Sequence, residues 1–570
     1  MTQQITTAEL QEIEALVGTP PILSEITPPV VSASVGRGGY DGASRFEKQI
    51  AGWVPPLHSA DLDILPDKEM LDTRTRDVVR NDAYIQGGVN IRKDSVVGAF
   101  YILNSKPMWE LLGKTEEWAE EFQREVEQKF TLWAESPMKW VDASRQNDFT
   151  SLIRLGVGMD VLGGEVLATA EWSSARGREY RTCVQMIDPD RLRTPDTYMH
   201  DKRVRGGIRR AKNGEPLSAY IRVQHPSDYQ IDVQYEHWFR EVKWRKPWGR
   251  EQVIFLREQQ RPDQTRAVSA MAAGLREVAI TRKFRDVTLQ KAVLAATYAA
   301  TIESEMPSSA LYEQLGASVP GSGVNGVNSM VSYAQDYLVA LNQYVGASKN
   351  MLIDGVKIPH LFPGTKLNMV QAGNPAGVGQ EFEQSLLRYI AALLGVSYEE
   401  LARDYTKTNY SSARAAMATT SKYMASRKRL VADALANSIF RLWLEEAINN
   451  DKLDTFKASE SDQLYTDGVL NTLFDALANC DWIGAARAQI DELKETQAAV
   501  LRIKYGLSTH EDELSRLGKD WRKVYAQLER ETEEREKRGI VLLEDNSVNA
   551  ASGSPREQED EGTSADSPDE

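Results

Sequence analysis

The order of apolar and polar residues along the chain predicts helices on both sides of a β-rich region. Residues 109–136 contain the clearest amphipathic helix, because apolar side chains recur there at steps of three or four. These side chains are Trp118, Phe122, Val126, Phe130 and Trp133. Between residues 180 and 260, apolar and polar residues alternate in short runs broken by turn sequences, which is typical of strands. We therefore expect an α+β fold that is predominantly helical, not a repeating βαβ series.

Long helices are predicted after the β-rich region. Residues 267–305 contain one glycine and no internal proline, and at ~1.5 Å per residue such a helix would exceed ~50 Å. A second helix is expected at 379–395 and a third at 411–450, where Ser411 and Ser412 offer hydroxyls for the N-cap. The segment between the first two is rich in Gly, Ser and Asn and ends in a run that reads as short strands with turns.

The C-terminal part of the chain is predicted to be helical up to residue 540. Residues 508–511, Ser-Thr-His-Glu, read as a capping box that opens one helix with an apolar stripe. The stripe consists of Leu514, Leu517, Trp521, Val524 and Leu528. Residues 541–570 contain nine acids and one base and almost nothing apolar beyond their first three positions, so we expect a disordered acidic tail.

Composition and charge narrow the class of protein. Lys and Arg number 68 against 83 Asp and Glu, a formal charge of −15. Residues 201–300 have a net positive charge, with twenty basic and eleven acidic residues. The two cysteines lie far apart in sequence, which excludes a disulfide scaffold and a cysteine-based zinc module. No apolar stretch approaches the ~18 residues of a membrane span, and the N-terminus lacks the features of a signal peptide.

The chain shows no motif that predicts catalysis. Its six histidines form no HExxH pair, and neither a GxxxxGK[ST] phosphate loop nor a GxSxG nucleophile elbow is present. Cys183 lies inside an apolar run and reads as a small buried hydrophobe. Residues 188–191, Asp-Pro-Asp-Arg, read as turn chemistry and not as a catalytic carboxylate pair. We therefore expect no enzyme, no metal and no cofactor.

Several stretches, in order, resemble the lambda-type portal protein family of tailed bacteriophages. They are residues 73–98, 186–196, 253–271, 363–417 and 441–448. The most specific is GVSYEELARDYTKTNYSSARAAM, which joins a helix end, a polar loop and a helix start. One departure is Arg266-Ala267, where many members of the family have an Arg-Gly pair.

The resemblance implies a portal fold, assembled as a ring that is commonly a dodecamer. Such a fold has a wing, a stem of two helices, a clip between them and a helical crown. On this chain the expected parts are a flexible arm (1–45), the wing (46–266), the first stem helix (267–305), the clip (306–375), the second stem helix (376–396), the tunnel loop (397–412), a long helix toward the crown (413–448), the crown (449–540) and the acidic tail (541–570).

The resemblance also implies a function and partners. The ring would be the channel for double-stranded DNA at one vertex of the capsid, without sequence specificity. It would bind the terminase large subunit, the major capsid or scaffold protein and a head–tail connector or adaptor protein. The protein would be found in the virion, and in the host cytoplasm during assembly, with no membrane partner. The alternatives are a head-completion or scaffold-type protein without a DNA channel, and a packaging enzyme.

The expected DNA-facing residues lie in the tunnel loop and on the first stem helix. A channel should hold phosphates weakly, because each fixed contact releases counterions and adds affinity that translocation must overcome. In the loop the candidates are Arg403, Asp404, Tyr405, Thr406, Lys407, Thr408, Asn409 and Tyr410. On the stem helix the basic candidates, for DNA or for neighbouring subunits, are Arg276, Arg282, Lys283, Arg285 and Lys291.

Overall fold

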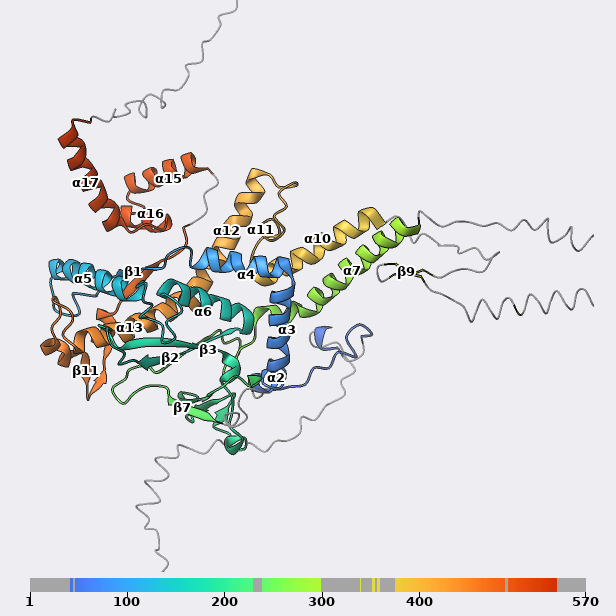
Figure 1. Cartoon of the computed structure of the whole chain (residues 1–570), viewed down its shortest axis with the longest axis horizontal. Coiled ribbons are helices and arrows are strands. Elements are labelled where there is room, and N and C mark those ends of the chain that lie inside the picture. The colour runs from blue at the N-terminus through green and yellow to red at the C-terminus, as the bar shows by residue number, and fades with distance from the viewer. Residues whose placement is uncertain are drawn as a thin grey trace, which may run out of the picture. The chain divides into compact units, whose positions relative to one another are not determined.

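The computed structural model describes residues 41–44, 47–228, 238–298, 339, 351–353, 356–358, 375–486 and 491–540. The chain divides into two compact units, Met1–His58 and Ser59–Glu570. The described part of the first unit contains a short 3-10 helix, η1 (Asp41–Ala43). The second unit is shown in Figure 1 and carries all the elements that follow. None of the described helices is long and apolar enough to cross a membrane.

The second unit is an α+β fold in which helices predominate, as the sequence predicts. Its α-helices are α2 (Ala60–Ile64), α3 (Lys68–Asn81), α4 (Ala83–Val96), α5 (Glu116–Ala134), α6 (Phe149–Gly163), α7 (Leu275–Tyr298), α10 (Pro375–Leu394), α11 (Tyr398–Ala402), α12 (Tyr410–Arg427), α13 (Ala434–Asn449), α14 (Thr472–Leu477), α15 (Glu492–Lys504), α16 (His510–Arg516) and α17 (Trp521–Arg538). Its strands are β1 (Ile102–Ser105), β2 (Glu165–Trp172), β3 (Thr182–Ile187), β4 (Val204–Arg205), β5 (Ile208–Arg210), β6 (Pro216–Arg222), β7 (Phe239–Lys243), β8 (Val253–Arg257), β9 (Met351–Ile353), β10 (Val356–Ile358), β11 (Tyr465–Thr466), β12 (Val469–Leu470) and β13 (Cys480–Ile483).

Two antiparallel sheets form the β-rich region. One has the strand order β3-β2-β8 and the other β4-β5-β6-β7. Helix α6 packs on β2, and α13 packs on β3 and β8, so the first sheet is covered by helices from two distant parts of the sequence. A further pair, β1 with β13, joins Ile102–Ser105 to Cys480–Ile483. The hairpin β9–β10 matches the short strands expected there, although most of the predicted clip lies outside the described residues.

An aromatic cluster holds the main core together. Phe130 of α5 lies 5.4 Å from Trp443 and 5.5 Å from Phe440, both on α13, measured between ring centroids. Phe149, at the start of α6, and Trp482 of β13 lie 5.2 and 5.9 Å from the same ring. Edge-to-face pairs of this kind add to the free energy that burial of the rings already contributes. The predicted stripe on α5 is confirmed, but the helix begins at Glu116, because Thr115 caps it and residues 109–113 form turns.

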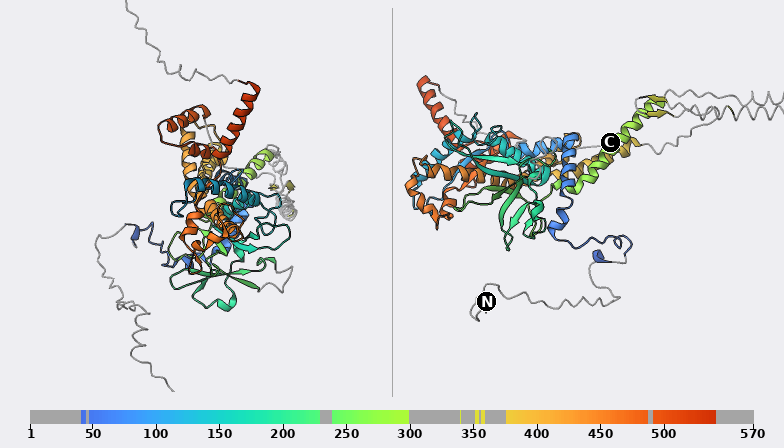
Figure 2. Two further views of the ribbon diagram at one scale, coloured as in Figure 1. Left: turned by 90° about the vertical axis from the view of Figure 1, so that its left-hand side faces the viewer. Right: turned by 60° about the horizontal axis from the view of Figure 1, so that its bottom comes forward.

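Helices α7 and α10 lie side by side and project together from the rest of the unit (Figure 2). The rings of Phe284 and Phe382 meet between them, with their centroids 5.1 Å apart. The helix predicted from residue 267 is observed only from Leu275, after the 3-10 helix η6 (Ala270–Gly274). A Cβ at Gly274 would lie 1.9 Å from Leu393 Cδ1, so this glycine allows α10 to approach closely. Residues 299–305 lie outside the described chain.

The helix predicted over 411–450 is present but contains a π-helical turn. Residues Lys428–Asp433 form this turn between α12 and α13. The prediction that Ser411 and Ser412 supply the N-cap hydroxyls is wrong, because Asn409 caps the helix and Ser412 completes a capping box at its third residue.

The single helix predicted after residue 508 is observed as two. Helix α16 ends at Arg516, and α17 begins at Trp521, because Gly518 takes a φ of +71° that is unfavourable for other residues. The predicted capping box is displaced by one position, since Thr509 and Asp512 form it in place of Ser508 and Glu511. The predicted stripe is therefore divided between two helices.

Candidate nucleic-acid interface

The loop between α10 and α12 begins with a capped helical turn. The Ser397 side chain accepts a hydrogen bond from the backbone N–H of Glu400, and Glu400 Oε2 accepts from the backbone N–H of Ser397 at 3.0 Å. The same Oε2 atom accepts from the Thr420 hydroxyl of α12 at 2.9 Å. The carboxylate of Glu400 thus links the first turn of the loop to the helix that follows it.

A tight turn built on Asp404 shapes the middle of the loop. Arg403 ends α11 in the left-handed conformation, with φ of +53°. Asp404 Oδ1 then accepts from the backbone N–H of Thr406 at 3.2 Å and from its hydroxyl at 2.6 Å, and Oδ2 accepts from the Tyr398 hydroxyl at 3.2 Å. The hydrogen bonds from Thr406 are the main reason that the pKa of Asp404 lies below its ordinary value. Asp404 therefore acts as an internal anchor that stays ionised.

The remaining loop residues are turned toward solvent. Arg403, Tyr405, Thr406, Lys407, Asn409 and Tyr410 are exposed, while Asp404 and Thr408 are half-buried. Within the part of the chain that the structure describes, neither Arg403 nor Lys407 has an ion-pair partner within 4.0 Å. Asn409 differs from its neighbours, because its side chain is used to cap α12. The loop therefore presents two uncommitted cations together with hydroxyl and aromatic groups.

Two arginines and a tyrosine fix α12 behind the loop. The guanidinium groups of Arg92 and Arg427 both lie over the Tyr423 ring, with their Cζ atoms 5.6 and 5.3 Å from its centroid. Gly395 takes a φ of +71°, and a Cβ there would lie 2.1 Å from Tyr423 Cε1. The end of α10 can therefore lie directly against this ring. The sequence alone does not reveal these supports, because nothing in the spacing of Arg92, Gly395 and Tyr423 indicates that they meet.

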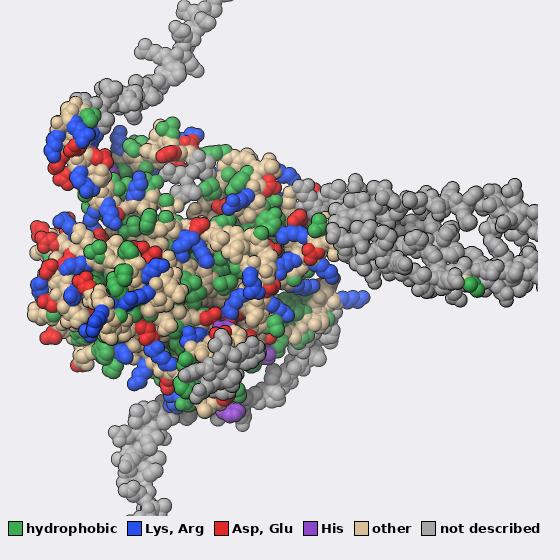
Figure 3. Space-filling model, viewed as in Figure 1, with side chains coloured by type: hydrophobic (Ala, Val, Ile, Leu, Met, Phe, Trp, Pro, Cys, Tyr) green, Lys and Arg blue, Asp and Glu red, His purple; other side chains and the backbone are tan. Residues whose placement is uncertain are grey.

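The five basic candidates on α7 fall into two groups. Arg282 pairs with Asp77 at 3.2 Å, and Arg285 pairs with Glu383 of α10 at 2.9 Å. Asp82 lies 3.8 Å from Arg282 Nε and 3.4 Å from Arg285 Nη1, so these two cations are partly neutralised inside the chain. On the face drawn in Figure 3, Lys and Arg are likewise interspersed with Asp and Glu, so each cation must be judged by its own neighbours.

The other three basic residues of α7 share one exposed face. Arg276, Lys283 and Lys291 are exposed and, within the described ranges, have no ion-pair partner within 4.0 Å. Their spacing of seven and then eight residues puts them within about 80° of one another on a helix of ~3.6 residues per turn. Val278 and Thr281 are buried on the opposite side. We call Arg276, Lys283 and Lys291 the stem stripe.

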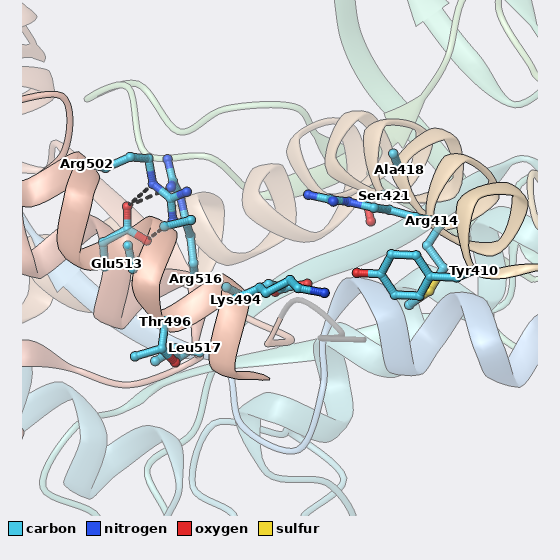
Figure 4. Close-up of a pocket in the computed structure, with 14 residues that line it drawn as sticks. Tyr410, Arg414, Ala418, Ser421, Lys494, Thr496, Arg502, Glu513, Arg516 and Leu517 are labelled. Atoms are coloured by element: carbon cyan, nitrogen blue, oxygen red, sulfur yellow. Dashed lines mark hydrogen bonds and ion pairs between the residues drawn. The ribbon is translucent and has the colours of Figure 1, made fainter. Parts of the chain in front are cut away.

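A cavity of about 240 Å³ lies beside the loop, between α12 and the helices α15 and α16. Figure 4 shows Tyr410 and Arg414 extending into this space from one side and Lys494 from the other. The Lys494 ammonium is 5.8 Å from the centroid of the Tyr410 ring. On the α15–α16 side, Glu513 accepts hydrogen bonds from Arg502 and Arg516. The hydrogen bond from Arg502 is the main reason that the pKa of Glu513 is lowered to about 2.

The turn at residues 188–191 is the one place in the described ranges where three potential metal ligands meet, namely Asp188, Asp190 and His225. Arg76 already occupies it, with its guanidinium hydrogen-bonded to Asp190 at 2.8 Å and close to Asp188 at 3.4 Å. The Asp188 side chain caps the 3-10 helix η2 (Pro189–Arg191), so the prediction of turn chemistry is confirmed. Cys183 is buried as expected, and burial raises the pKa of its thiol.

Comparison with known proteins gives matches along most of the chain. The family model described as phage portal protein, lambda family, matches residues 46–428. The chain is 34% identical over 535 residues to portal protein B of Escherichia phage lambda, a match that covers 92% of this chain and 94% of that protein. It is also 34% identical over 508 residues to the portal protein of Escherichia phage N15, covering 88% and 91% of the two chains.

Solved structures give a weaker likeness. A chain from the neck of a native gene transfer agent particle, computed with C12 symmetry, is 11% identical with a TM-score of 0.37 and covers 80% of this chain and 99% of its own length. A chain from the neck of an empty particle, computed with C6 symmetry, is 14% identical with a TM-score of 0.36 and covers 76% and 94% of the two chains.

Proposed function

Because the chain belongs to the lambda family of phage portal proteins, we propose that the loop from Arg403 to Tyr410 lines its DNA channel and contacts the phosphate backbone. A portal protein is a virion component at one capsid vertex, through which DNA enters during packaging and leaves at ejection. What supports the placement is the loop itself: its two ends are fixed by Glu400 and Asn409, while Arg403 and Lys407 are left exposed. A fixed loop with few free cations provides weak, sequence-independent attraction.

We propose that the stem stripe adds a second set of weak phosphate contacts. Arg276, Lys283 and Lys291 lie on the exposed face of α7, whereas Arg282 and Arg285 are committed to Asp77, Asp82 and Glu383. A cation already paired with a carboxylate has less charge to offer a phosphate. The stripe, not the full set of five basic residues, is therefore the part of α7 directed at DNA, or at the neighbouring subunit where the stripe faces one.

The proposed assembly is a dodecameric ring whose parts follow the family plan. Helices α7 and α10 would form the stem, the segment between them the clip, and the helices after residue 449 the crown. The clip would bind the terminase large subunit, which would hydrolyse ATP in place of this chain. The ring would also bind a head–tail connector and the capsid or scaffold protein, and it would assemble in the host cytoplasm.

The experiment that tests the loop is Lys407→Glu in the phage that encodes this chain. We expect normal rings in electron micrographs but at least a tenfold loss of DNase-protected DNA. The reason is that the glutamate carboxylate at position 407 of each subunit would repel the DNA phosphates where the loop approaches them. Lys407→Arg should restore protection. The matched control is Lys523→Glu, an exposed lysine of α17 outside the loop. Normal packaging by Lys407→Glu would refute the role of this residue, and loss of rings would point to assembly instead.

A further inference from the structure

The cavity beside the loop has a charge balance that suits an anion. Its lining contains four cations, Arg414, Lys494, Arg502 and Arg516, against two acids, Glu495 and Glu513, a net of +2. Arg502 and Arg516 both form ion pairs with Glu513, with nitrogen-to-oxygen distances of 2.7 and 2.8 Å. Arg414 has no ion-pair partner within 4.0 Å among the described residues, and Lys494, paired with Asp491 at 3.0 Å, still leaves 72% of its side chain exposed.

Arg414 and Lys494 face one another from different elements. Arg414 extends from α12 and Lys494 from α15, and both point into the same space (Figure 4). Two cations directed at one cavity repel each other unless an anion lies between them, and an anion there would draw α12 and α15 together. The chemistry of the site is therefore that of an oxyanion receptor, with the Tyr410 hydroxyl as a further donor.

The chain itself supplies an acidic segment, which follows α17 in the sequence. Residues 541–570 contain nine acids and one base, and four of the acids lie between Glu557 and Glu561. We propose that the carboxylates of this segment bind in the cavity between α12 and α15–α16, on Arg414 and Lys494. We call the segment bound in this way the strap.

The lengths agree with this assignment. Helix α16 lines the cavity, and α17 follows it, with 18 residues that extend ~27 Å at ~1.5 Å per residue. The acidic segment begins just after α17, and a flexible chain of thirty residues has a mean span of ~30 Å. When the span of a tether matches the distance between its anchor and the site, the effective concentration of the tethered group is in the millimolar range. The cavity would therefore be occupied even if the carboxylates bind it weakly.

The size of the cavity favours carboxylate side chains over duplex DNA. A volume of about 240 Å³ admits one or two acidic side chains, whereas a duplex could reach Arg414 only with a phosphate at its edge. Because Arg414 follows the loop by four residues, a bound strap would also compete with DNA for this cation. This inference does not rest on the proposed role of Lys407.

A labelled peptide of residues 541–570 tests the proposal. The receptor is the full chain with Glu557→Gln, Glu559→Gln, Asp560→Asn and Glu561→Gln, so that its own segment does not compete. We expect the peptide to bind at low salt, and the added pair Arg414→Gln and Lys494→Gln to weaken binding at least tenfold. The matched control is Arg530→Gln with Lys523→Gln, two exposed cations of α17 that do not line the cavity. The control should bind as the parent does.

Hydrogen exchange on the full chain gives a second readout. Amides of α15 should exchange more slowly in the natural chain than in the chain with the four neutralised acids. Equal peptide binding by the Arg414–Lys494 variant and the control would overturn the proposal, as would equal exchange in the two chains. If a short DNA duplex binds through Arg414 and Lys494 and the peptide does not, the site belongs to nucleic acid and the strap is wrong.

Discussion

The charged residues of this chain occur in two contrasting environments, one buried at the entry to α7 and one exposed on the loop and the stem stripe. At the entry, Glu165 has no exposed surface and accepts from Arg266 at 2.7 Å and from the backbone N–H of Ala267 at 2.5 Å. On the loop, Arg403 and Lys407 are exposed and unpaired within the described chain. Charged side chains that are paired inside the protein thus stabilise the fold. Charged side chains that are exposed and have no internal partner remain available to bind a ligand.

The buried cluster fixes the direction in which α7 leaves the β-rich region. Arg266 donates to the backbone carbonyls of Leu192 and Pro189 at 2.8 and 3.1 Å. Lys68 donates to the carbonyl of Ala267 at 2.6 Å and lies 3.4 Å from Glu165. Burial raises the pKa of Glu165, but the charges of Arg266 and Lys68 outweigh it, so the net pKa lies below the ordinary value. Glu165 is therefore ionised at neutral pH and completes the cluster.

The largest predicted effect is that of Glu165→Gln. Removing the negative charge leaves Arg266 and Lys68 buried without their common partner, which should cost about 3–5 kcal/mol of the free energy of unfolding. Denaturant unfolding of the two proteins measures it. The control is Glu383→Gln, which breaks a half-buried pair with Arg285 and should cost about 1 kcal/mol or less. A loss below 1 kcal/mol for Glu165→Gln would show that the two environments do not differ as we describe.

A smaller effect is predicted for the pH dependence that Asp72 contributes. Burial raises its pKa from 3.8 to about 6, against the opposing effect of Lys68 at 3.0 Å. A carboxyl whose pKa is raised on folding favours the folded state below pH 3.8, and this contribution is lost as the pH rises toward 6. Asp72→Asn removes that dependence. The difference in unfolding free energy, natural chain minus variant, should therefore fall by up to about 3 kcal/mol between pH 4 and pH 7.

Unfolding curves at pH 4, 5, 6 and 7 test the Asp72 prediction, because other titrating groups cancel in the difference between the two proteins. A difference that stays constant across this range would show that Asp72 keeps an ordinary pKa in the folded state. A difference that rises with pH would mean that the attraction of Lys68 outweighs burial, which is the opposite sign.

Sequence patterns predicted the elements of this fold better than the contacts between them. The stripe on α5 and the strands around Cys183 follow from local periodicity, which one segment displays by itself. The Arg266–Glu165 pair joins positions 101 residues apart, and neither residue differs from a surface residue in its local pattern. The departure at Arg266-Ala267 was visible in the sequence, but its role as a buried junction appears only when the sheet and α7 are packed together.

The candidate site shows the same limit. The loop was recognised as a segment, and the exposure of Lys407 agrees with a polar run. The division of the α7 cations could not be predicted, because it depends on Asp77, Asp82 and Glu383, which come from three other helices or their junctions. Helical spacing alone indicates that the cations lie on more than one face, and only the packing of α3, α4 and α10 identifies the paired face.

The smallest predicted effect concerns this division on α7. Arg276→Gln with Lys283→Gln removes two exposed cations that have no ion-pair partner among the described residues, and should change the unfolding free energy by no more than about 0.5 kcal/mol. Arg282→Gln with Arg285→Gln removes the same charge from the same helix but breaks half-buried pairs, which should cost about 1 kcal/mol. DNA binding should show the reverse order, because only the stripe variant removes cations that are free to release counterions, and its salt dependence should become shallower. The two variants could instead lose equal amounts of unfolding free energy and of DNA affinity. That result would show that the intramolecular pairs do not determine which cations contact DNA.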